Sequence, residues 1–331
     1  MSRSRAVVLV SFLVVATGVV AGLGALALDP ARASVGPLPG AGLALPADSR
    51  FVMGLDVKRF TASPFYGKYA QGARRLDALK ALEERTGLNP ERDLDQIVMA
   101  GSGPGRSDDG VVLALGRFDQ YKLGRAIETQ HTGVTSKKVH GATVYLFGEG
   151  HTRVTALAFL DDDALVMGAQ KPVENVLANR ASGQASLKGN RGLMDLLGRV
   201  KPGSTFWMVG DQNLLSNIPR DIPTPGGAGA MQLPAMKTLV VTGDLDPIIS
   251  LELTGEAADE AAARSLADVV KGLTALAALQ ANQRPEFKEL ASAVSVTTEA
   301  TSVHVNARVP YELLESLQRQ ATPKPAVEPA R

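Results

Sequence analysis

The sequence predicts an α+β fold with two related halves of mostly antiparallel β-sheet covered by helices, preceded by one N-terminal apolar helix. Three observations predict it. An uncharged apolar run opens the chain, strand patterns come in hairpins separated by single helices, and three sequence landmarks recur in the same order in both halves. Hairpins indicate antiparallel pairing, whereas parallel strands need a crossover helix between them.

The N-terminal apolar run extends over Ala6–Leu28, 23 residues without a charge. As a helix rising ~1.5 Å per residue it reaches ~34 Å, enough to cross a bilayer core of ~30 Å. Arg3 and Arg5 precede the run and Asp29 closes it. A basic start before an apolar segment directs the following chain out of the cytoplasm. We therefore expect the folded body in the periplasm or cell envelope.

Residues 1–33 have two open fates. A retained run anchors the protein in the inner membrane, because it is long enough to span. Alternatively it is a signal peptide, for which Ala31 and Ala33 before Ser34 form a small-x-small cleavage site and release a secreted protein. The chain has no cysteine, which excludes the lipid attachment of a bacterial lipoprotein.

The composition is that of an ordinary globular protein. Hydrophobic residues make up 45% of the chain, charged residues 21% and aromatic residues 5%. The formal net charge is +1, of which residues 1–33 contribute +2, leaving about −1 on the rest. No basic excess exists to neutralise phosphates, so we expect no nucleic-acid partner. A body of this size buries ~75% of its unfolded surface and needs no disulfide.

The chain divides into four parts after residue 33. Residues 34–45 are rich in glycine and proline and predict a linker. Residues 46–200 and 201–321 form the two α+β units. Residues 322–331 contain three prolines in ten positions and predict a disordered tail.

Three landmarks relate the two units and predict an internal repeat. The first is a strand with the pattern F-x-M-x-x-D, found at Phe51–Asp56 and at Phe206–Asp211. The second is a strand with a glycine near its end, followed by an aspartate that starts a helix, Asp119 in one unit and Asp259 in the other. The third is a closing helix initiated by proline, Pro172 and Pro310 respectively.

Alternating and helical hydrophobic patterns place the remaining elements. Helices are predicted at 63–85, 119–128, 172–181 and 192–200, from 259 onward, and from 310 onward. Strands are predicted at 96–101, 111–115, 134–139, 142–147, 155–160, 164–168, 206–209, 238–243, 248–254, 294–298 and 302–309.

Three segments resemble ligand-binding or catalytic motifs, and each has a simpler interpretation. Gly101–Gly105 resembles a phosphate loop but leads into a strand, not into the helix N-terminus that such a loop needs. Asp161–Asp163 predicts a turn, because a calcium loop needs alternating oxygen ligands and a distal glutamate. Thr135–Lys138 resembles a Ser-x-x-Lys arrangement but alternates like a strand.

The histidines show no metal-ligand spacing. His131, His140, His151 and His304 include no pair at i, i+4, which favours surface histidines over a zinc site assembled across strands. We therefore predict no catalytic, cofactor-binding or metal-binding residue and no cofactor, and we expect no enzyme. A hydrolase built from distant positions stays an alternative, because it leaves no motif.

Four methionines, Met53, Met99, Met167 and Met208, fall on predicted strands. Thioether side chains can line an adaptable apolar groove, although filling a core is their commoner role. Trp207, the only tryptophan, alternates with Phe206 and Met208 and is expected to be buried in the core, with exposure to solvent or a partner as the alternative.

The anchor, the Gly/Pro linker and the Pro-x-x-x-x-Phe strand together resemble uncharacterised exported bacterial proteins built from duplicated α+β units. That resemblance implies an envelope location and this architecture, and no activity. The sequence thus predicts a tethered, non-enzymatic binding or scaffolding module with the membrane as one partner. The second expected partner is a protein or an apolar ligand. The alternative function is to carry or sense an apolar ligand such as a lipid.

Intact mass spectrometry of protein extracted from a membrane fraction tests the N-terminal prediction. We expect the full 331-residue chain of 34.7 kDa, because residues 6–28 are long enough to span. A mass lower by residues 1–33 would establish cleavage after Ala33 instead. Full-length protein free in the cytosolic fraction would contradict export altogether.

Overall fold

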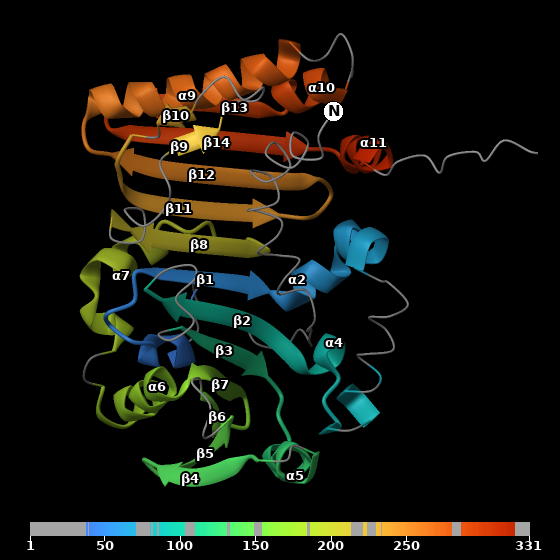
Figure 1. Ribbon diagram of the computed structural model, residues 1–331, viewed down its shortest axis with the longest axis vertical. Coiled ribbons are helices and arrows are strands. Elements are labelled where there is room, and N and C mark those ends of the chain that lie inside the picture. The colour runs from blue at the N-terminus through green and yellow to red at the C-terminus, as the bar shows by residue number, and fades with distance from the viewer. Residues whose placement is uncertain are drawn as a thin grey trace, which may run out of the picture.

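The computed structural model has a mixed α+β fold around one large antiparallel sheet (Figure 1). It describes residues 38, 40–70, 80, 82–84, 86–102, 110–130, 133–148, 154–183, 186–212, 221–223, 230–232, 234–279 and 286–321. The sheet has twelve strands, in the spatial order β13 (Val294–Glu299), β14 (Ser302–Val309), β12 (Ile249–Ala257), β11 (Met236–Asp244), β8 (Phe206–Asp211), β1 (Phe51–Asp56), β2 (Leu94–Gly101), β3 (Val111–Gly116), β7 (Ala164–Ala169), β6 (Thr155–Asp161), β5 (Ala142–Phe147) and β4 (Thr135–Val139). A separate hairpin pairs β9 (Asp221–Pro223) with β10 (Ala230–Gln232).

Strands β1 and β8, which carry the two F-x-M-x-x-D segments, pair with each other at the middle of this sheet. Outward from β1 the strands follow in the order β2, β3, β7, β6, and outward from β8 in the order β11, β12, β14, β13. If β1 and β8 are counted as first, the third strand of each half (β3 or β12) therefore pairs with the strand that comes last in the chain order of that half (β7 or β14). The β4–β5 hairpin extends only the first half among the described strands. One continuous sheet, not two separate ones, thus holds both halves.

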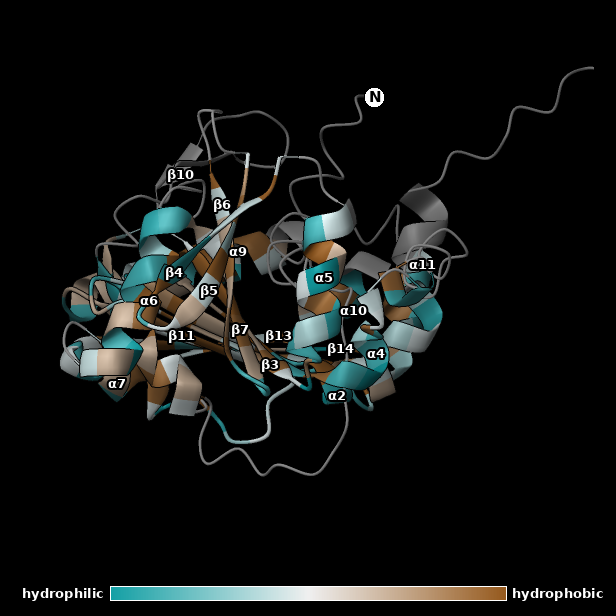
Figure 2. Cartoon of the chain, turned by 90° about the horizontal axis from the view of Figure 1, so that it is seen from below, coloured by the Kyte–Doolittle hydropathy of each residue, from teal (hydrophilic) through white to brown (hydrophobic). Residues whose placement is uncertain are grey.

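Side chains alternate between the two faces of the sheet. We call the side of Val52, Val98 and Trp207 the valine face, and the side of Met53, Met99 and Met208 the methionine face. Figure 2 shows α6 and α7 on one side of the sheet and α5, α10 and α11 on the other. The helical elements are η1 (Gly40–Ala44), α2 (Val57–Ala62), η2 (Tyr66–Ala70), α4 (Pro90–Asp93), α5 (Gln120–Gln130), α6 (Gln170–Ser182), η3 (Leu187–Gly189), α7 (Arg191–Leu197), α9 (Glu260–Leu279), α10 (Glu286–Ser292) and α11 (Tyr311–Ala321).

The helices bury the two faces to different extents. Apolar side chains of α6, η3 and α7 form one cluster with Val52, Val98 and Val209 on the valine face. On the methionine face, α2, η2 and α11 pack around Leu55 and Ile97, while α5 and α9 pack near opposite ends of the sheet. Among the described residues, the helices of the methionine face therefore lie around its borders.

Two aromatic residues of β8 pack against its two neighbouring strands. The ring of Trp207 lies over Gly54 of β1 on the valine face, and the ring of Phe206 lies over Gly243 of β11 on the methionine face. Trp207 is buried, as the sequence predicted. A glycine opposite each ring leaves the space that the ring fills, so both contacts depend on the missing side chain.

The predicted helix starts at Asp119 and Asp259 are confirmed. Their carboxylates accept hydrogen bonds from the backbone N–H groups of Lys122 and Ala262, at 3.0 Å and 2.8 Å. Helix α2 was not predicted, because Val57–Ala62 follows β1 without a break. Asp56 caps it by accepting a hydrogen bond from the N–H of Arg59 at 3.0 Å.

The linker predicted over 34–45 ends earlier than the sequence suggested. Gly40–Ala44 forms the short helix η1, and Leu45 is fully buried. The Asn179 side-chain amide donates a hydrogen bond to the carbonyl of Ala44 at 3.1 Å, and the N–H of Leu187 donates to the carbonyl of Leu45 at 2.7 Å. Packing and hydrogen bonding override the glycine-rich composition, so the body begins by Gly40.

The predicted membrane segment and its flanking residues lie outside the described residues, as do most of 34–39 and the tail 322–331. Within the part of the chain that is described, no helix is both long enough and apolar enough to cross a bilayer.

Substituting Gly54→Ala tests the contact that joins β8 to β1. A Cβ atom there would lie 2.4 Å from the Trp207 ring, so we expect a loss of about 1–3 kcal/mol in the free energy of unfolding. Urea unfolding of the full chain in mild detergent, followed by fluorescence of Trp207, measures it. Gly189→Ala is the control, because a Cβ there has no neighbour within 4 Å. Equal stability of both variants would contradict the proposed role of this pair.

Candidate functional site

The methionine face carries a row of apolar side chains, four of them methionines, at the centre of the sheet. Met208, Met53, Met99, Val112 and Met167 stand directly opposite one another across β8, β1, β2, β3 and β7. We call these five residues the methionine row. The same register continues it with apolar residues on both sides, Val241 and Leu253 beyond β8 and Leu157 beyond β7.

The methionine row is partly exposed, although it lies at the middle of the sheet. Met167 is 41% exposed, and the other four members are half-buried. The row directly behind it on the valine face is closed by contrast, with exposures of 4% or less for Trp207, Val98, Leu113 and Val166. At these positions the same strands therefore bury the side chains of one face and leave thioether groups within reach on the other.

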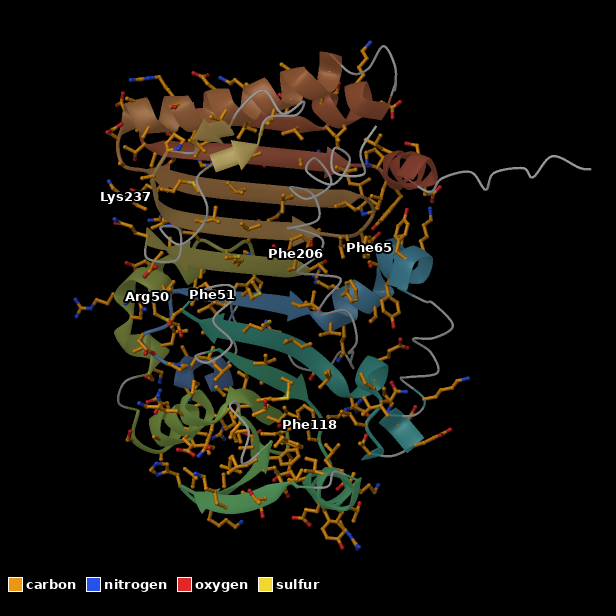
Figure 3. All side chains as sticks on the ribbon, viewed as in Figure 1. Arg50, Phe51, Phe65, Phe118, Phe206 and Lys237 are labelled. Atoms are coloured by element: carbon orange, nitrogen blue, oxygen red, sulfur yellow. The ribbon has the colours of Figure 1, made fainter. Side chains whose placement is uncertain are left out.

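Aromatic rings flank the row. Phe51 and Phe206 precede the row methionines of β1 and β8 by two residues, so both rings belong to the methionine face. Figure 3 shows them on the two central strands. Arg50 and Asp211 form an ion pair at 3.4 Å beside them, but the alternation places that pair on the valine face. The row itself contains no charged or hydrogen-bonding group.

An aromatic cluster borders the row on one side. Phe60, Phe65, Tyr66, Tyr69 and Tyr311 bring together α2, η2 and α11, with ring centroids 5.1–6.4 Å apart. The Tyr311 hydroxyl donates a hydrogen bond to the carbonyl of Leu245, and burial raises its pKa to about 12. The cluster stabilises the packing of these helices against one another, because offset and edge-on ring pairs add to the energy of burial.

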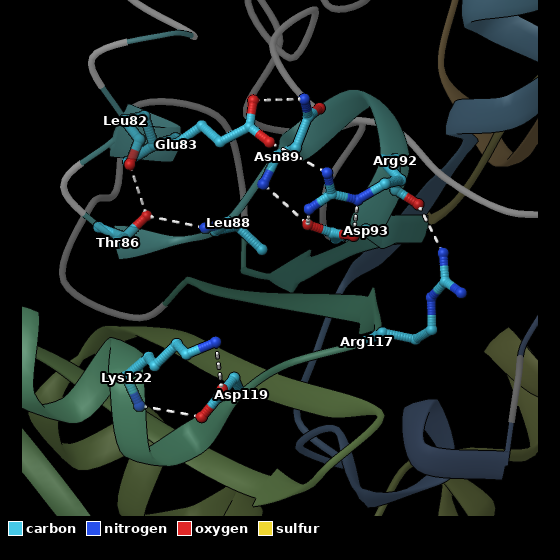
Figure 4. A network of polar contacts seen from close by, with 10 residues as sticks. All are labelled: Leu82, Glu83, Thr86, Leu88, Asn89, Arg92, Asp93, Arg117, Asp119 and Lys122. Atoms are coloured by element: carbon cyan, nitrogen blue, oxygen red, sulfur yellow. Dashed lines mark hydrogen bonds and ion pairs between the residues drawn. The ribbon is translucent and has the colours of Figure 1, made fainter.

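A hollow of about 540 Å³ lies elsewhere, between α4, the start of α5 and the Asp161–Asp163 turn. Arg92 there forms two hydrogen bonds of 2.8 Å to Asp93 and one of 3.0 Å to Glu83 (Figure 4). Lys122 pairs with Asp119 at 3.2 Å, and its backbone N–H helps to lower the pKa of that carboxyl. These charges hold neighbouring elements together, and the methionine row is the better candidate for a binding surface.

The candidate motifs have the structures that their simpler interpretations predicted. Asp161–Asp163 is the turn between β6 and β7, where the N–H of Asp163 donates to the side chain of Asp161 at 2.9 Å. Thr135–Val139 is the extended edge strand β4. Of the segment 101–105, Gly101 ends β2, and residues 103–105 lie outside the described residues.

The two histidines that the structure describes lie near opposite edges of the sheet and do not come together. His140 lies in the tight turn between β4 and β5, and Nδ1 of His304 lies 3.1 Å from the Thr254 hydroxyl. His131 and His151 lie outside the described residues. Among those that are described, no three His, Cys, Asp or Glu side chains are grouped so that they could hold a metal ion.

The residues predicted to flank or end the N-terminal segment, namely Arg3, Arg5, Asp29, Ala31, Ala33 and Ser34, likewise lie outside the described part of the chain. What sequence reasoning missed is the alignment of the methionines. Their placement on strands was visible, but the strand pairing that puts Met53 opposite both Met99 and Met208 was not.

Comparisons with known proteins find little. No protein-family model matches the chain, and no curated protein matches it significantly. Among solved structures, crystal form III of TP0453 is similar with a TM-score of 0.47 and 12% identity, covering 87% of this chain and 100% of that one. Crystal form I of TP0453 has a TM-score of 0.45 and 11% identity, covering 88% and 99%. Likenesses this weak imply nothing about activity, ligand or location.

Mild peroxide treatment tests the exposure of the row. We expect Met167 to form the sulfoxide before Met53, Met99 and Met208, because oxidation of a thioether follows its exposure and Met167 is 41% exposed. Peptide mass mapping over time measures the order. Oxidation of Met53 ahead of Met167 would contradict the arrangement described for this face.

Proposed function

We propose that this chain is an exported, non-enzymatic protein of the bacterial cell envelope that binds an apolar ligand, such as a lipid acyl chain, on the methionine row. The observation that carries the proposal is the partial exposure of four thioether side chains on one face of a sheet whose other face is closed directly behind them. Flexible, polarizable thioethers adapt to ligands of varied shape, and for that reason they recur on promiscuous apolar surfaces.

The dimensions of the row suit a chain-like ligand. From Met208 to Met167 the row crosses four strand-to-strand steps, or about 19 Å at ~4.8 Å per step. A long acyl chain laid across the strands would contact each member in turn. Because the row has no hydrogen-bonding group, it supplies apolar contact without demanding polar atoms from the ligand.

Location and architecture belong to the same proposal. The apolar run 6–28 would hold the body at the outer surface of the inner membrane, and a body of near-neutral charge fits a role that does not depend on nucleic acid. We also propose that the two halves are related α+β units, on the strength of their matching strand orders around β1 and β8.

Binding of a fluorescent long-chain fatty acid to the full chain in detergent tests the ligand class. Met53→Lys puts a charge inside the row, so we expect affinity to fall by more than about tenfold, while Met53→Leu leaves it nearly unchanged. The comparison between variants cancels any probe bound by the N-terminal segment or by detergent.

Thr297→Lys is the matched control, because Thr297 is exposed on β13 and its side chain belongs to the valine face. We expect it to bind the probe like the unmodified protein. If Met53→Lys binds as tightly as Thr297→Lys, and urea unfolding shows both folded, the row is not the ligand site. The proposal also requires that unlabelled fatty acid displaces the fluorescent probe completely from the unmodified protein.

A further inference from the structure

Three methionines of the row are immediate neighbours. Met53 on β1 stands directly opposite Met99 on β2 and directly opposite Met208 on β8. Directly opposed residues in antiparallel strands have Cβ atoms about 4.5–5.5 Å apart. The side chain of Met53 therefore starts between those of Met99 and Met208, which start two strands or about 9.6 Å apart. Both outer side chains are long and flexible enough to lean toward the sulfur atom of Met53. We call Met53, Met99 and Met208 the methionine triad.

The fourth methionine of the row stands apart. Val112 lies between Met99 and Met167, so the side chain of Met167 begins two strands away from that of Met99. Met167 thus has the same side chain and lies on the same face as the triad, but no methionine stands directly opposite it. It therefore serves as the control residue for the triad.

Thioether sulfur is a soft, uncharged donor. It selects soft monovalent ions such as Cu(I), whereas hard divalent ions such as Ca²⁺ and Mg²⁺ select oxygen, which the triad does not offer. A thioether carries no proton to lose, so coordination needs no deprotonation. The chain contains no cysteine, so no thiolate competes for such an ion.

The surroundings suit an ion of low charge. Met53, Met99 and Met208 are half-buried, which leaves a path for entry while apolar neighbours limit water. The rings of Phe51 and Phe206 adjoin the triad on the same face, and an aromatic face attracts a nearby cation. No lysine or arginine belongs to the row, so no fixed positive charge stands among the donors.

We infer that Met53, Met99 and Met208 form a three-sulfur site for a soft monovalent cation, Cu(I) in its chemical class. The inference goes beyond the proposed apolar ligand, because it uses the sulfur atoms and not the hydrocarbon surface of the row. Binding is simple coordination, in which three lone pairs are shared with the ion and no electron is transferred.

Silver titration of the full chain in chloride-free detergent buffer tests the site, with Ag(I) as a soft probe of the same charge that stays monovalent in air. Native mass spectrometry counts bound ions, and isotope-edited spectra of the methionine methyl groups show which sulfur atoms take part. We expect one Ag(I) per chain, with methyl shifts at Met53, Met99 and Met208 that exceed the shift at Met167.

Three variants sharpen the test, each replacing methionine by leucine of similar volume so that folding is kept. Met53→Leu and Met208→Leu should weaken silver binding by more than about tenfold, since even the loss of an outer-shell partner commonly costs that much in metal affinity. Met167→Leu should leave it unchanged. Unchanged binding in Met53→Leu, or an equal loss in Met53→Leu and Met167→Leu, would overturn the inference, and so would the absence of binding at micromolar Ag(I).

Different results would reject the apolar-ligand proposal and the ion-site proposal. Met53→Leu removes one sulfur but keeps the apolar surface, so it should lose silver and keep the fatty-acid probe. Loss of fatty-acid binding with silver binding intact would reject the apolar ligand alone. Retained fatty-acid binding in a protein that binds no silver would reject the ion site alone.

Discussion

The pairing of β1 with β8 is the interaction on which the rest of this structure depends. It joins the two halves edge to edge, so that twelve strands make one sheet and neither half presents a free edge at the junction. An unpaired strand edge exposes a line of backbone donors and acceptors. Covering two such edges with each other satisfies both sets of groups at once and places the F-x-M-x-x-D segments side by side.

That pairing also explains why β8 has two aromatic residues in succession. Phe206 and Trp207 point to opposite faces, and each ring fills the space above a glycine on a different neighbouring strand, Gly243 on β11 and Gly54 on β1. The burial of Trp207 and the partial burial of Phe206 contribute several kcal/mol, and the fit to glycine ties that energy to a single register. A slip of one residue would move both rings off their glycines and turn every side chain to the other face.

The two faces of the sheet differ in burial because different helices cover them. The valine face near the centre is closed by α6, η3 and α7, and its packed valines and leucines supply the stability of the sheet. The helices of the methionine face gather at its borders, with the aromatic cluster of Tyr311 on one side. The packed core and the partly exposed methionines of β1, β2, β7 and β8 thus lie on opposite sides of the same strands.

Most of the secondary structure of this protein could be predicted from local sequence patterns. Alternation of apolar residues placed most strands within a few positions, and Asp119 and Asp259 marked helix starts through the local demand of unpaired N–H groups. It erred where tertiary packing outweighs composition, as at Gly40–Leu45, where buried contacts with α6 and η3 order a glycine-rich stretch. The methionine row, by contrast, becomes visible only when the strands are paired in three dimensions. Met53 and Met208 are 155 positions apart, and their alignment follows from long-range strand pairing, which periodicity within either strand does not encode.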